Sequence, residues 1–396
     1  MPSIPYEEIK PPQRILLGPG PSNTHPRVQQ AMIAPVLGHM DPYFYTIMEG
    51  NMKLLRYAFQ TGNKITFPIS GTGSAGMDAS FCNFLEPGDV AIIADNGYFA
   101  DRMINVASRC GAEVVRLETE WGNIIEPEAI EAAFKSRKKV KLLALVHAET
   151  STGVLQPLAE ASKLARQYDA LLLIDAVTSL GGQELAVDDW GIDICYSCSQ
   201  KCLGCPPGLS PITVNQKAMD TLQNRSSAVP SYYLDLSLLS KYWINEGGRA
   251  YHHTAPASMF YALHEALALV ADEGLEARIQ RHARNGGALQ AGLEAMGLTL
   301  HASPSHRLST LTTVRIPEGI EDARIRQRLL SDYNLEIGGG LGTLKGKVWR
   351  IGLMGYSSTE QNVLLVLSAL EKLLADEGYR AEAGAGINAA AKSLRK

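Results

Sequence analysis

Short, wholly apolar runs alternate with amphipathic segments along the first half of the chain. The apolar runs predict strands at 65–69 (ITFPI), 90–94 (VAIIA), 113–117 (EVVRL), 141–147 (KLLALVH) and 170–175 (ALLLID). The segments between them have helical spacing or open at a proline, and several close at a glycine. Strands that are apolar throughout and separated by helices are typical of a mostly parallel sheet covered on both faces, with right-handed crossovers.

The pattern changes after about residue 275. A long charged helical segment (274–297) is followed by alternating short strands and helices, which predict a smaller α+β domain. The sequence therefore predicts four parts: an N-terminal arm (1–22), a large domain (23–275), a small C-terminal domain (276–380) and a tail (381–396). The tail is rich in Ala and Gly and lacks a clear apolar face, so we expect it to be loosely held.

Length and composition narrow the classes of function. The chain has 396 residues, more than one compact core usually holds, with 45% hydrophobic and 20% charged residues. A net charge of −4 gives no electrostatic reason to expect a nucleic acid or an anionic membrane as partner. The sequence shows neither a signal-peptide pattern nor a run of about 20 apolar residues, so we expect a cytoplasmic protein with reduced cysteines.

Three polar features stand where strands end, which is where open α/β sheets bind ligands. The first is SGTGS (70–74), between a strand and a helix, whose glycines and free N–H groups suit a phosphate. A purely structural turn is the alternative. A dinucleotide site is disfavoured because no acidic residue stands suitably placed after the second strand, apart from Asp95.

The other two features are Asp175 and Lys201. Asp175 ends an apolar strand, where it either meets a cation or caps the following turn. Lys201 stands in CYSCSQKCLGCPPG (195–208), with no other charge from Gln200 to Ser210. Most lysines are solvated, but this environment favours a desolvated amine of lowered pKa. A lysine, a carboxylate and a phosphate cradle are together what pyridoxal phosphate requires.

These motifs resemble the class V, fold-type I aminotransferases, in particular the alanine–glyoxylate and serine–glyoxylate group. The resemblance covers nearly the whole chain. It rests on LLGPGPSNTHPRV (16–28), SGTGS, HAETSTGVLQPL (147–158), LLLIDAVTSLGG, SQKCLGCPPGLS, YHHTAP (251–256) and VWRIGLMG (348–355). The resemblance implies a large domain with a mostly parallel, seven-stranded sheet between helices, a small C-terminal domain and pyridoxal 5'-phosphate as cofactor.

The resemblance also implies roles in binding the cofactor. Lys201 would condense with its aldehyde, and Asp175 would pair with its ring nitrogen. Its phosphate would be held by Thr72, Gly73, Ser74 and Gln200.

The remaining implied roles involve the cofactor ring, the substrate and a second subunit. Phe99 would stack on the ring, although tryptophan is common there in relatives, and Thr150 would bond near its phenolic oxygen. Arg350 would clamp a substrate carboxylate, with a structural ion pair as the alternative. Tyr251 and Thr254 would reach the phosphate in the other subunit of a homodimer with shared active sites.

Four cysteines, Cys195, Cys198, Cys202 and Cys205, surround Lys201. Their order is permuted relative to an iron–sulfur run, and zinc knuckles normally stand farther apart. We therefore expect no metal and interpret the thiols as packing around a buried lysine.

The function expected from these features is transfer of an amino group from alanine or serine to glyoxylate. Lys201 would move the proton at the substrate Cα. Three alternatives remain open: another transaminase of the group, such as a pyridoxamine–pyruvate, serine–pyruvate or phosphonate-amine enzyme; a lyase of the same fold; or a metal or redox protein that uses the cysteine cluster.

Overall fold

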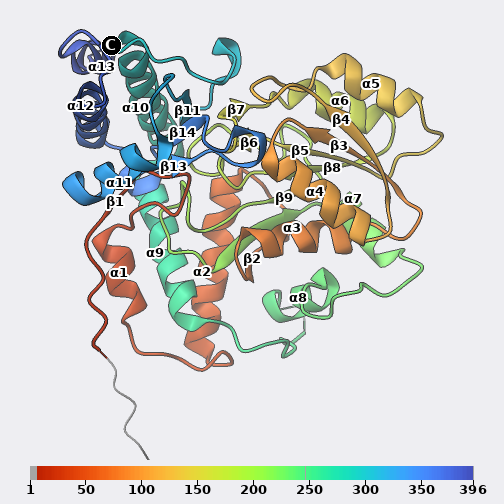
Figure 1. Cartoon of the computed structure of the whole chain (residues 1–396). Helices are drawn as coiled ribbons and strands as arrows, with labels where there is room; N and C mark the ends of the chain where they lie inside the picture. Colours follow the sequence, from red (N-terminus) through yellow and green to blue (C-terminus); the bar gives the residue numbers. More distant parts are fainter. Residues whose placement is uncertain (1–6, 246, 396) are drawn as a thin grey trace, which may run out of the picture.

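The computed structural model describes residues 7–245 and 247–395. Its strands, labelled in Figure 1, are β1 (Ile15–Leu16), β2 (Ile65–Ser70), β3 (Val90–Asp95), β4 (Glu113–Glu118), β5 (Leu142–Val146), β6 (Ala148–Glu149), β7 (Val154–Leu155), β8 (Leu171–Asp175), β9 (Ile194–Tyr196), β10 (Leu209–Val214), β11 (Leu311–Arg315), β12 (Leu335–Glu336), β13 (Gly338–Gly339) and β14 (Val348–Gly352).

The α-helices are α1 (Pro26–Met32), α2 (Pro42–Phe59), α3 (Gly73–Cys82), α4 (Tyr98–Arg109), α5 (Pro127–Lys135), α6 (Ala159–Gln167), α7 (Gln216–Gln223), α8 (Leu236–Trp243), α9 (Ala257–Glu273), α10 (Leu275–Ala295), α11 (Asp322–Tyr333), α12 (Glu360–Asp376) and α13 (Ala385–Leu394). Three short 3-10 turns lie at Pro304–His306, Gly342–Leu344 and Gly355–Ser357. Side-chain caps mark the start of several helices: Asp41 accepts from the Tyr43 N–H before α2, and Asp235 accepts from the Ser237 N–H before α8.

A seven-stranded sheet forms the centre of the molecule, in the order β2-β10-β9-β8-β5-β3-β4. Strand β10 is antiparallel to both its neighbours, and the other pairings are parallel. In Figure 1, helices α3 and α4 lie in front of this sheet, and α2 and α9 run side by side at its lower left. The predicted fold, a mostly parallel sheet flanked by helices, is confirmed.

The parallel register brings the predicted site residues to one edge of the sheet. Asp175, the last residue of β8, stands opposite Tyr196 of β9, and Val146 of β5 stands on its other side. The carboxyl ends of these strands therefore open into the same crevice. The strand interiors are fully buried, as their apolar sequences predicted.

The C-terminal part has its own sheet, β11-β14-β13, and its own apolar cluster. Residues of β14, α10 and α12 meet there, with Trp349 and Ile351 fully buried. A separate and larger cluster fills the space around the seven-stranded sheet. The domain division at residue 275 stays a prediction.

The prediction of a loosely held tail is wrong for the described residues. Residues 385–394 form helix α13, which packs on α10 and α12 and buries Ala390 completely. Glycines permit this close approach: a Cβ at Gly292 of α10 would lie 2.9 Å from the carbonyl oxygen of Gly386. The Ala/Gly composition that looked like a flexible end is thus what allows two helices to lie against each other.

The N-terminal segment runs from the small sheet to the crevice. Residues 1–6 of the predicted arm lie outside the described residues. Strand β1 pairs with β12, Leu17 enters the C-terminal apolar cluster, and Ser22 donates a hydrogen bond from its hydroxyl to the Lys201 carbonyl. This segment therefore connects the C-terminal cluster with the loop that carries Lys201.

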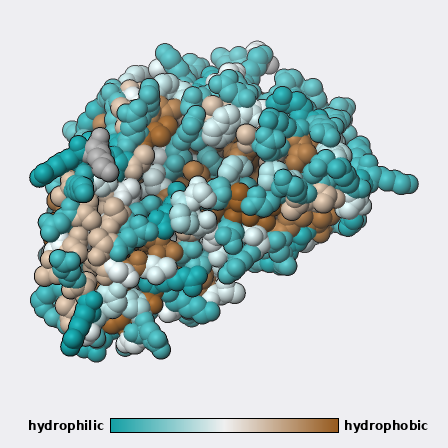
Figure 2. All heavy atoms as spheres, turned by 90° about the horizontal axis from the view of Figure 1, so that it is seen from above, coloured by the Kyte–Doolittle hydropathy of each residue, from teal (hydrophilic) through white to brown (hydrophobic). Residues whose placement is uncertain are grey.

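The surface is predominantly polar on the face seen in Figure 2, where hydrophobic atoms form separate patches among hydrophilic ones. None of the helices within residues 7–245 and 247–395 combines the length and the apolar character needed to cross a bilayer.

Candidate active site

A cavity of about 260 Å³ opens at the carboxyl ends of β8 and β9. Nine of the eleven predicted site residues line it: Thr72, Gly73, Ser74, Phe99, Thr150, Asp175, Gln200, Lys201 and Arg350. They come from segments up to 278 residues apart in the chain (350 − 72). The sequence features that were ambiguous one by one are therefore neighbours in space.

Lys201 lies in the turn after β9 and is 7% exposed. Its Nζ donates to the carbonyl oxygen of Pro19, and no carboxylate lies within 4 Å of it among the described residues. Burial lowers the pKa of this amine, and the positive charge of Arg350 acts in the same direction. A larger fraction of Lys201 is thus a neutral nucleophile at neutral pH than for a solvated lysine.

Asp175 forms the floor of the cavity and is buried. Its Oδ2 accepts from the Tyr196 hydroxyl at 2.5 Å, and its Oδ1 accepts from the Val177 N–H at 2.8 Å. Burial raises the pKa of Asp175 to about 6, although both hydrogen bonds oppose the rise. A buried carboxylate with only neutral donors would be stabilised by a cationic partner.

The start of helix α3 has N–H groups that could hold an anion. Thr72 stands at the N-cap position and makes no side-chain capping bond, so the first N–H groups of the helix remain available. Gly73 must be small, because a Cβ there would lie 3.0 Å from the Cβ of Cys198. The Oε1 atom of Gln200 is buried beside this site and has no hydrogen-bond partner among the described residues.

Phe99 and Thr150 form one wall of the cavity. Phe99 lies in the first turn of α4 and is half-buried, and the Arg102 guanidinium lies 5.2 Å from the centre of its ring. Thr150 follows β6 and is buried, with its carbonyl oxygen directed at the Arg350 guanidinium. Phe99 follows the connection between β3 and α4, whereas Thr150 lies in the turn between β6 and β7.

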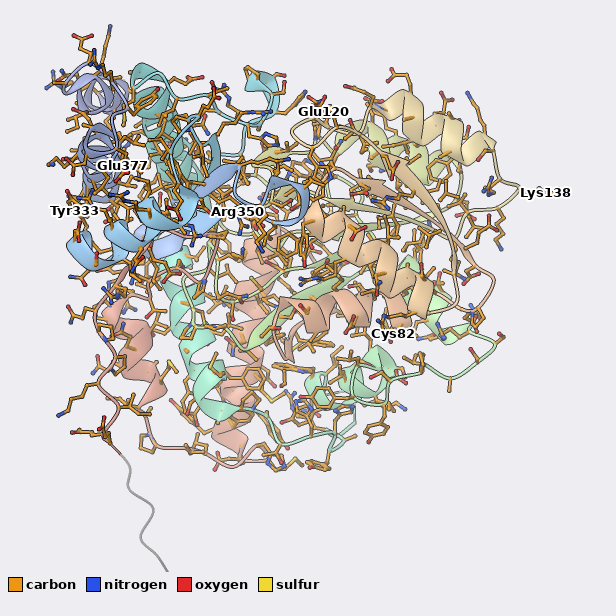
Figure 3. The ribbon with its side chains drawn as sticks, viewed as in Figure 1. Cys82, Glu120, Lys138, Tyr333, Arg350 and Glu377 are labelled. Atoms are coloured by element: carbon orange, nitrogen blue, oxygen red, sulfur yellow. The ribbon has the colours of Figure 1, made fainter. Side chains whose placement is uncertain are left out.

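Arg350 reaches the cavity from β14, the middle strand of the C-terminal sheet, as Figure 3 shows at its labelled position. Trp349 and Ile351 point into the C-terminal cluster, so alternation directs Arg350 to the opposite face. Its Nε donates to the Gly339 carbonyl at 2.7 Å, and its Nη1 lies 3.4 Å from the Thr150 carbonyl. No carboxylate lies within 4 Å among the described residues, which argues against the structural ion pair weighed above.

Tyr251 and Thr254 do not line the cavity of their own chain. Tyr251 is 60% exposed, and its ring contacts that of His39 at 5.2 Å between centroids. Thr254 is exposed as well. Their predicted role in a second subunit stays a prediction.

The four cysteines around Lys201 are buried. No three His, Cys, Asp or Glu side chains among the described residues are grouped so that they could bind a metal ion. Burial raises the pKa of the Cys198 and Cys202 thiols to about 12, which makes them poor nucleophiles and ligands. A Cβ at Gly182 would lie 2.5 Å from the Cys202 sulfur, so this thiol fills a tight space.

Sequence reasoning missed several residues of the site. Tyr196 holds Asp175, Pro19 and Gly20 cover Lys201, and Arg102 lines the cavity. Tyr196 stood within the quoted cysteine-rich stretch, but nothing in the sequence shows that β9 lies beside β8. The arm residues carry no chemical signal at all, because Pro19 acts through a carbonyl oxygen.

A larger cavity, about 440 Å³, lies on the other side of the Lys201 loop. Its arginines are already occupied: Arg278 bonds Glu273 and the Cys202 carbonyl, and Arg281 bonds Glu273. Glu273 pairs with both guanidinium groups, whereas Lys201 and Arg350 in the smaller cavity have no acidic partner within 4 Å among the described residues, so the smaller cavity is the better candidate for chemistry.

The smaller cavity fits pyridoxal phosphate. It contains a buried amine without a counter-ion, a buried carboxylate without a cation, an uncapped helix N-terminus and an unpartnered amide oxygen on Gln200. An aldehyde, a protonated ring nitrogen and a phosphate would complement these groups in turn.

Comparisons with known proteins agree with the geometry. The chain matches the family described as Aminotransferase class-V over residues 25–365. It is 41% identical to the (S)-ureidoglycine–glyoxylate transaminase of Bacillus subtilis, covering 97% of this chain and 96% of the relative.

Two solved structures show the same similarity. An alanine–glyoxylate aminotransferase from Nostoc sp. superposes with a TM-score of 0.91 at 49% identity, covering 94% of this chain and 98% of that one. The pyridoxamine–pyruvate aminotransferase of Mesorhizobium loti has a TM-score of 0.91 at 29% identity, covering 98% of this chain and 99% of that one. The chain thus belongs to the class-V aminotransferases, and it is a pyridoxal-phosphate-dependent transaminase.

Proposed function

We propose that the enzyme transfers the amino group of a small amino acid to glyoxylate. The observation that carries the proposal is Arg350, a buried guanidinium without an acidic partner that shares a cavity with Lys201. Its planar donors match a carboxylate in two-point geometry. Amino acids and 2-oxo acids both carry a carboxylate, so Arg350 would orient the substrate in both halves of the reaction.

The side chains of the cavity divide the work. Pyridoxal phosphate, when bound, supplies an aldehyde that carries the amino group and a ring that accepts the electron pair left at the substrate Cα. With the cofactor bound, Lys201 Nζ would be the group that moves the proton at the substrate Cα. Asp175, fixed by Tyr196 and Val177, holds the proton on the ring nitrogen.

The remaining residues orient the reactants. The first turn of α3, with Gln200, anchors the phosphate. Phe99 would face the cofactor ring, and Thr150 would bond near its phenolic oxygen. Arg350 keeps the substrate Cα within reach of Lys201.

Two findings support small substrates. The arm packs closely over Lys201, where a Cβ at Gly20 would lie 2.6 Å from the lysine Cδ, and the cavity of about 260 Å³ must also hold the cofactor. The relatives from Bacillus subtilis and Nostoc sp. differ in the donor that their names state but share glyoxylate. We therefore assign glyoxylate as acceptor and alanine or serine as donors.

The assignment is tested with a panel of donors and acceptors. The purified protein, loaded with pyridoxal phosphate, is assayed with alanine, serine, (S)-ureidoglycine and pyridoxamine against glyoxylate and pyruvate. We expect the highest kcat/KM for alanine or serine with glyoxylate. A preference for ureidoglycine would replace alanine or serine as the assigned donor. A preference for pyridoxamine with pyruvate would overturn the proposed function.

We also propose that two copies complete each site by exchanging Tyr251 and Thr254. Exposed apolar side chains stand on the segments that meet at Tyr251: Met40, Tyr43 and Tyr232 are 45%, 67% and 67% exposed. They belong together, because His39 contacts Tyr251 and His252 stacks on Tyr232. A surface of exposed aromatic residues is typical of an interface between proteins.

Mixed dimers test the exchange. Lys201→Ala and Tyr251→Ala are each expected to be weak, but a dimer of the two contains one site with both native residues. Denatured and refolded together, they should regain up to about a quarter of the wild-type activity. A mixture no more active than the two variants alone would rule out the exchange, as would a wild-type protein that is monomeric by light scattering.

A further inference from the structure

Glu149, the last residue of β6, is completely buried and has no role in the steps above. A buried carboxylate is unfavourable unless it is compensated. No Lys, Arg or His lies within 4 Å of it among the described residues. Its compensation consists of hydrogen bonds: Oε1 accepts from the N–H and hydroxyl of Ser151 at 2.9 and 2.7 Å, and Oε2 accepts from the Phe99 N–H at 3.1 Å.

These bonds cap helix α4 from a distant part of the chain. Gly97, at the N-cap position, has no side chain with which to cap the helix. Glu149 accepts the Phe99 N–H instead, and the Ser151 hydroxyl accepts the Tyr98 N–H at 2.9 Å. A carboxylate at a helix N-terminus is also favoured by the helix dipole.

Gly97 is required for this approach. A Cβ at position 97 would lie 2.4 Å from the Cγ of Glu149 and 2.6 Å from the Ser151 hydroxyl oxygen. Glu149 and Ser151 are both fully buried, so any larger residue at position 97 would have to displace them. The close packing shows that the distance between β6 and the start of α4 is fixed by these contacts.

The groups fixed in this way line the cavity. Phe99 stands on the first turn of α4, and Thr150 lies between Glu149 and Ser151 with its carbonyl oxygen facing Arg350. Glu149 therefore connects the aromatic wall for the cofactor ring with the arginine for the substrate carboxylate. Its negative charge also opposes the fall in the pKa of Arg350, to about 10, that burial causes.

We propose that Glu149 is a positioning residue that holds Phe99 and Thr150 in their places around the cofactor. The proposal rests on the proposed function only in the identity of the cofactor. Burial raises the pKa of Glu149 to about 7, while the N–H and O–H donors favour the ionised form. The three donors engage both oxygens of Glu149, which is the hydrogen-bond pattern of the ionised carboxylate.

The test is the variant Glu149→Gln. The NH2 group of the new side chain would face an N–H or O–H group whose hydrogen bond the native carboxylate accepts. In the cofactor-free protein, hydrogen exchange of the amides at 98–101 should quicken by about tenfold or more, because the capping bond is lost. In the loaded protein, the dissociation constant for pyridoxal phosphate should rise by about tenfold, with a shifted visible absorption spectrum. Ser151→Ala, which removes only the bridge to Tyr98, should show a smaller change in the same direction.

Asp193→Asn is the matched control. Asp193 is also buried and accepts from the Leu172 N–H and the Asn215 amide, but it lies at the opposite end of the sheet. The Asp193→Asn variant should have a lower melting temperature, with unchanged amide hydrogen exchange at 98–101 and unchanged cofactor affinity. Equal effects of the Glu149 and Asp193 variants on affinity would reduce Glu149 to a purely structural residue.

A double-mutant cycle with Phe99→Ala decides whether Glu149 acts through the aromatic wall. If it does, the double variant loses less cofactor affinity than the sum of the two single losses. Additive losses would overturn the proposal, as would wild-type exchange at 98–101 in Glu149→Gln. Failure of the wild type to take up the cofactor at Lys201 would instead refute the proposed function, and the exchange experiment would still judge Glu149.

Discussion

Lys201 and Arg350 are two buried cations that share one cavity and behave differently. They are 7% and 6% exposed, and neither has an acidic partner within 4 Å among the described residues. Burial lowers both pKa values, but that of Arg350 falls only to about 10. Arg350 thus keeps its charge at neutral pH, whereas the lysine starts from a lower value and loses its proton more readily.

The difference shows how one apolar environment supports two kinds of chemistry. An amine that gives up its proton can attack an aldehyde and then carry a proton, while a guanidinium that keeps its charge can bind an anion. The surroundings also differ. Lys201 lies in a turn covered by the arm, and Arg350 stands in the middle of a sheet where strands hold its direction.

Lys201→Ala gives the largest expected effect. Without the amine that moves the Cα proton, kcat should fall by at least about a thousandfold. The assay is initial-rate transamination, with borohydride reduction and peptide mapping to locate the bound cofactor. Lys217→Ala, a half-exposed lysine on α7, serves as control and should retain activity. A Lys201→Ala protein at the wild-type rate would refute the assignment.

Arg350→Ala should weaken substrate binding more than it slows the later steps. Loss of a charged hydrogen-bond pair is worth about 1.5–3 kcal/mol, or roughly a tenfold to hundredfold rise in KM for carboxylate substrates. Arg350→Lys should restore only part of the lost substrate binding, because an ammonium group lacks the planar two-point geometry of guanidinium. Arg315→Ala, at the exposed end of β11 in the same sheet, is the control. Unchanged kinetics of the alanine variant would remove Arg350 from the site.

Asp175 should make cofactor affinity depend on pH. Its pKa, raised to about 6, leaves it ionised at pH 7.5 and neutral at pH 5, where it cannot pair with a cationic ring nitrogen. The cofactor-free protein should lose stability as pH rises from about 4 to 6, because a buried carboxyl ionises there. The rise in melting temperature on adding the cofactor should therefore be larger at pH 7.5 than at pH 5.

The variant Asp175→Asn isolates this contribution. It should bind the cofactor about tenfold more weakly at pH 7.5 and abolish most of the difference between the two pH values. If the wild type and the variant respond equally to pH, another group is responsible.

Cys202→Ala should have the smallest effect. Removing a buried sulfur costs about 1 kcal/mol of folding free energy, seen as a few degrees in melting temperature, while activity changes little. The measurement is thermal unfolding beside the transamination assay, with metal analysis of the purified protein. Stoichiometric zinc or iron, or loss of activity with a chelator, would contradict the packing interpretation.

The sequence by itself determined the class of the sheet, its main strands and the chemistry at their carboxyl ends, but not the order of the strands. Apolar runs such as ALLLID can only be strands buried on both faces, and polar residues directly after them must meet at one edge. Motifs around Lys201, Asp175 and Arg350 then identified the family, since each residue type is suited to one part of the cofactor or substrate.

Only the tertiary structure decided which groups support those residues. Tyr196 bonds Asp175 across 21 positions of the chain, and Glu149 bonds Phe99 across 50. The contact between Pro19 and Lys201 spans 182 positions. The helical tail was missed for a related reason: Ala and Gly carry no apolar periodicity, yet they let α13 approach α10 closely. Local patterns report what a segment prefers, whereas burial and hydrogen bonding depend on the partner that folding brings alongside.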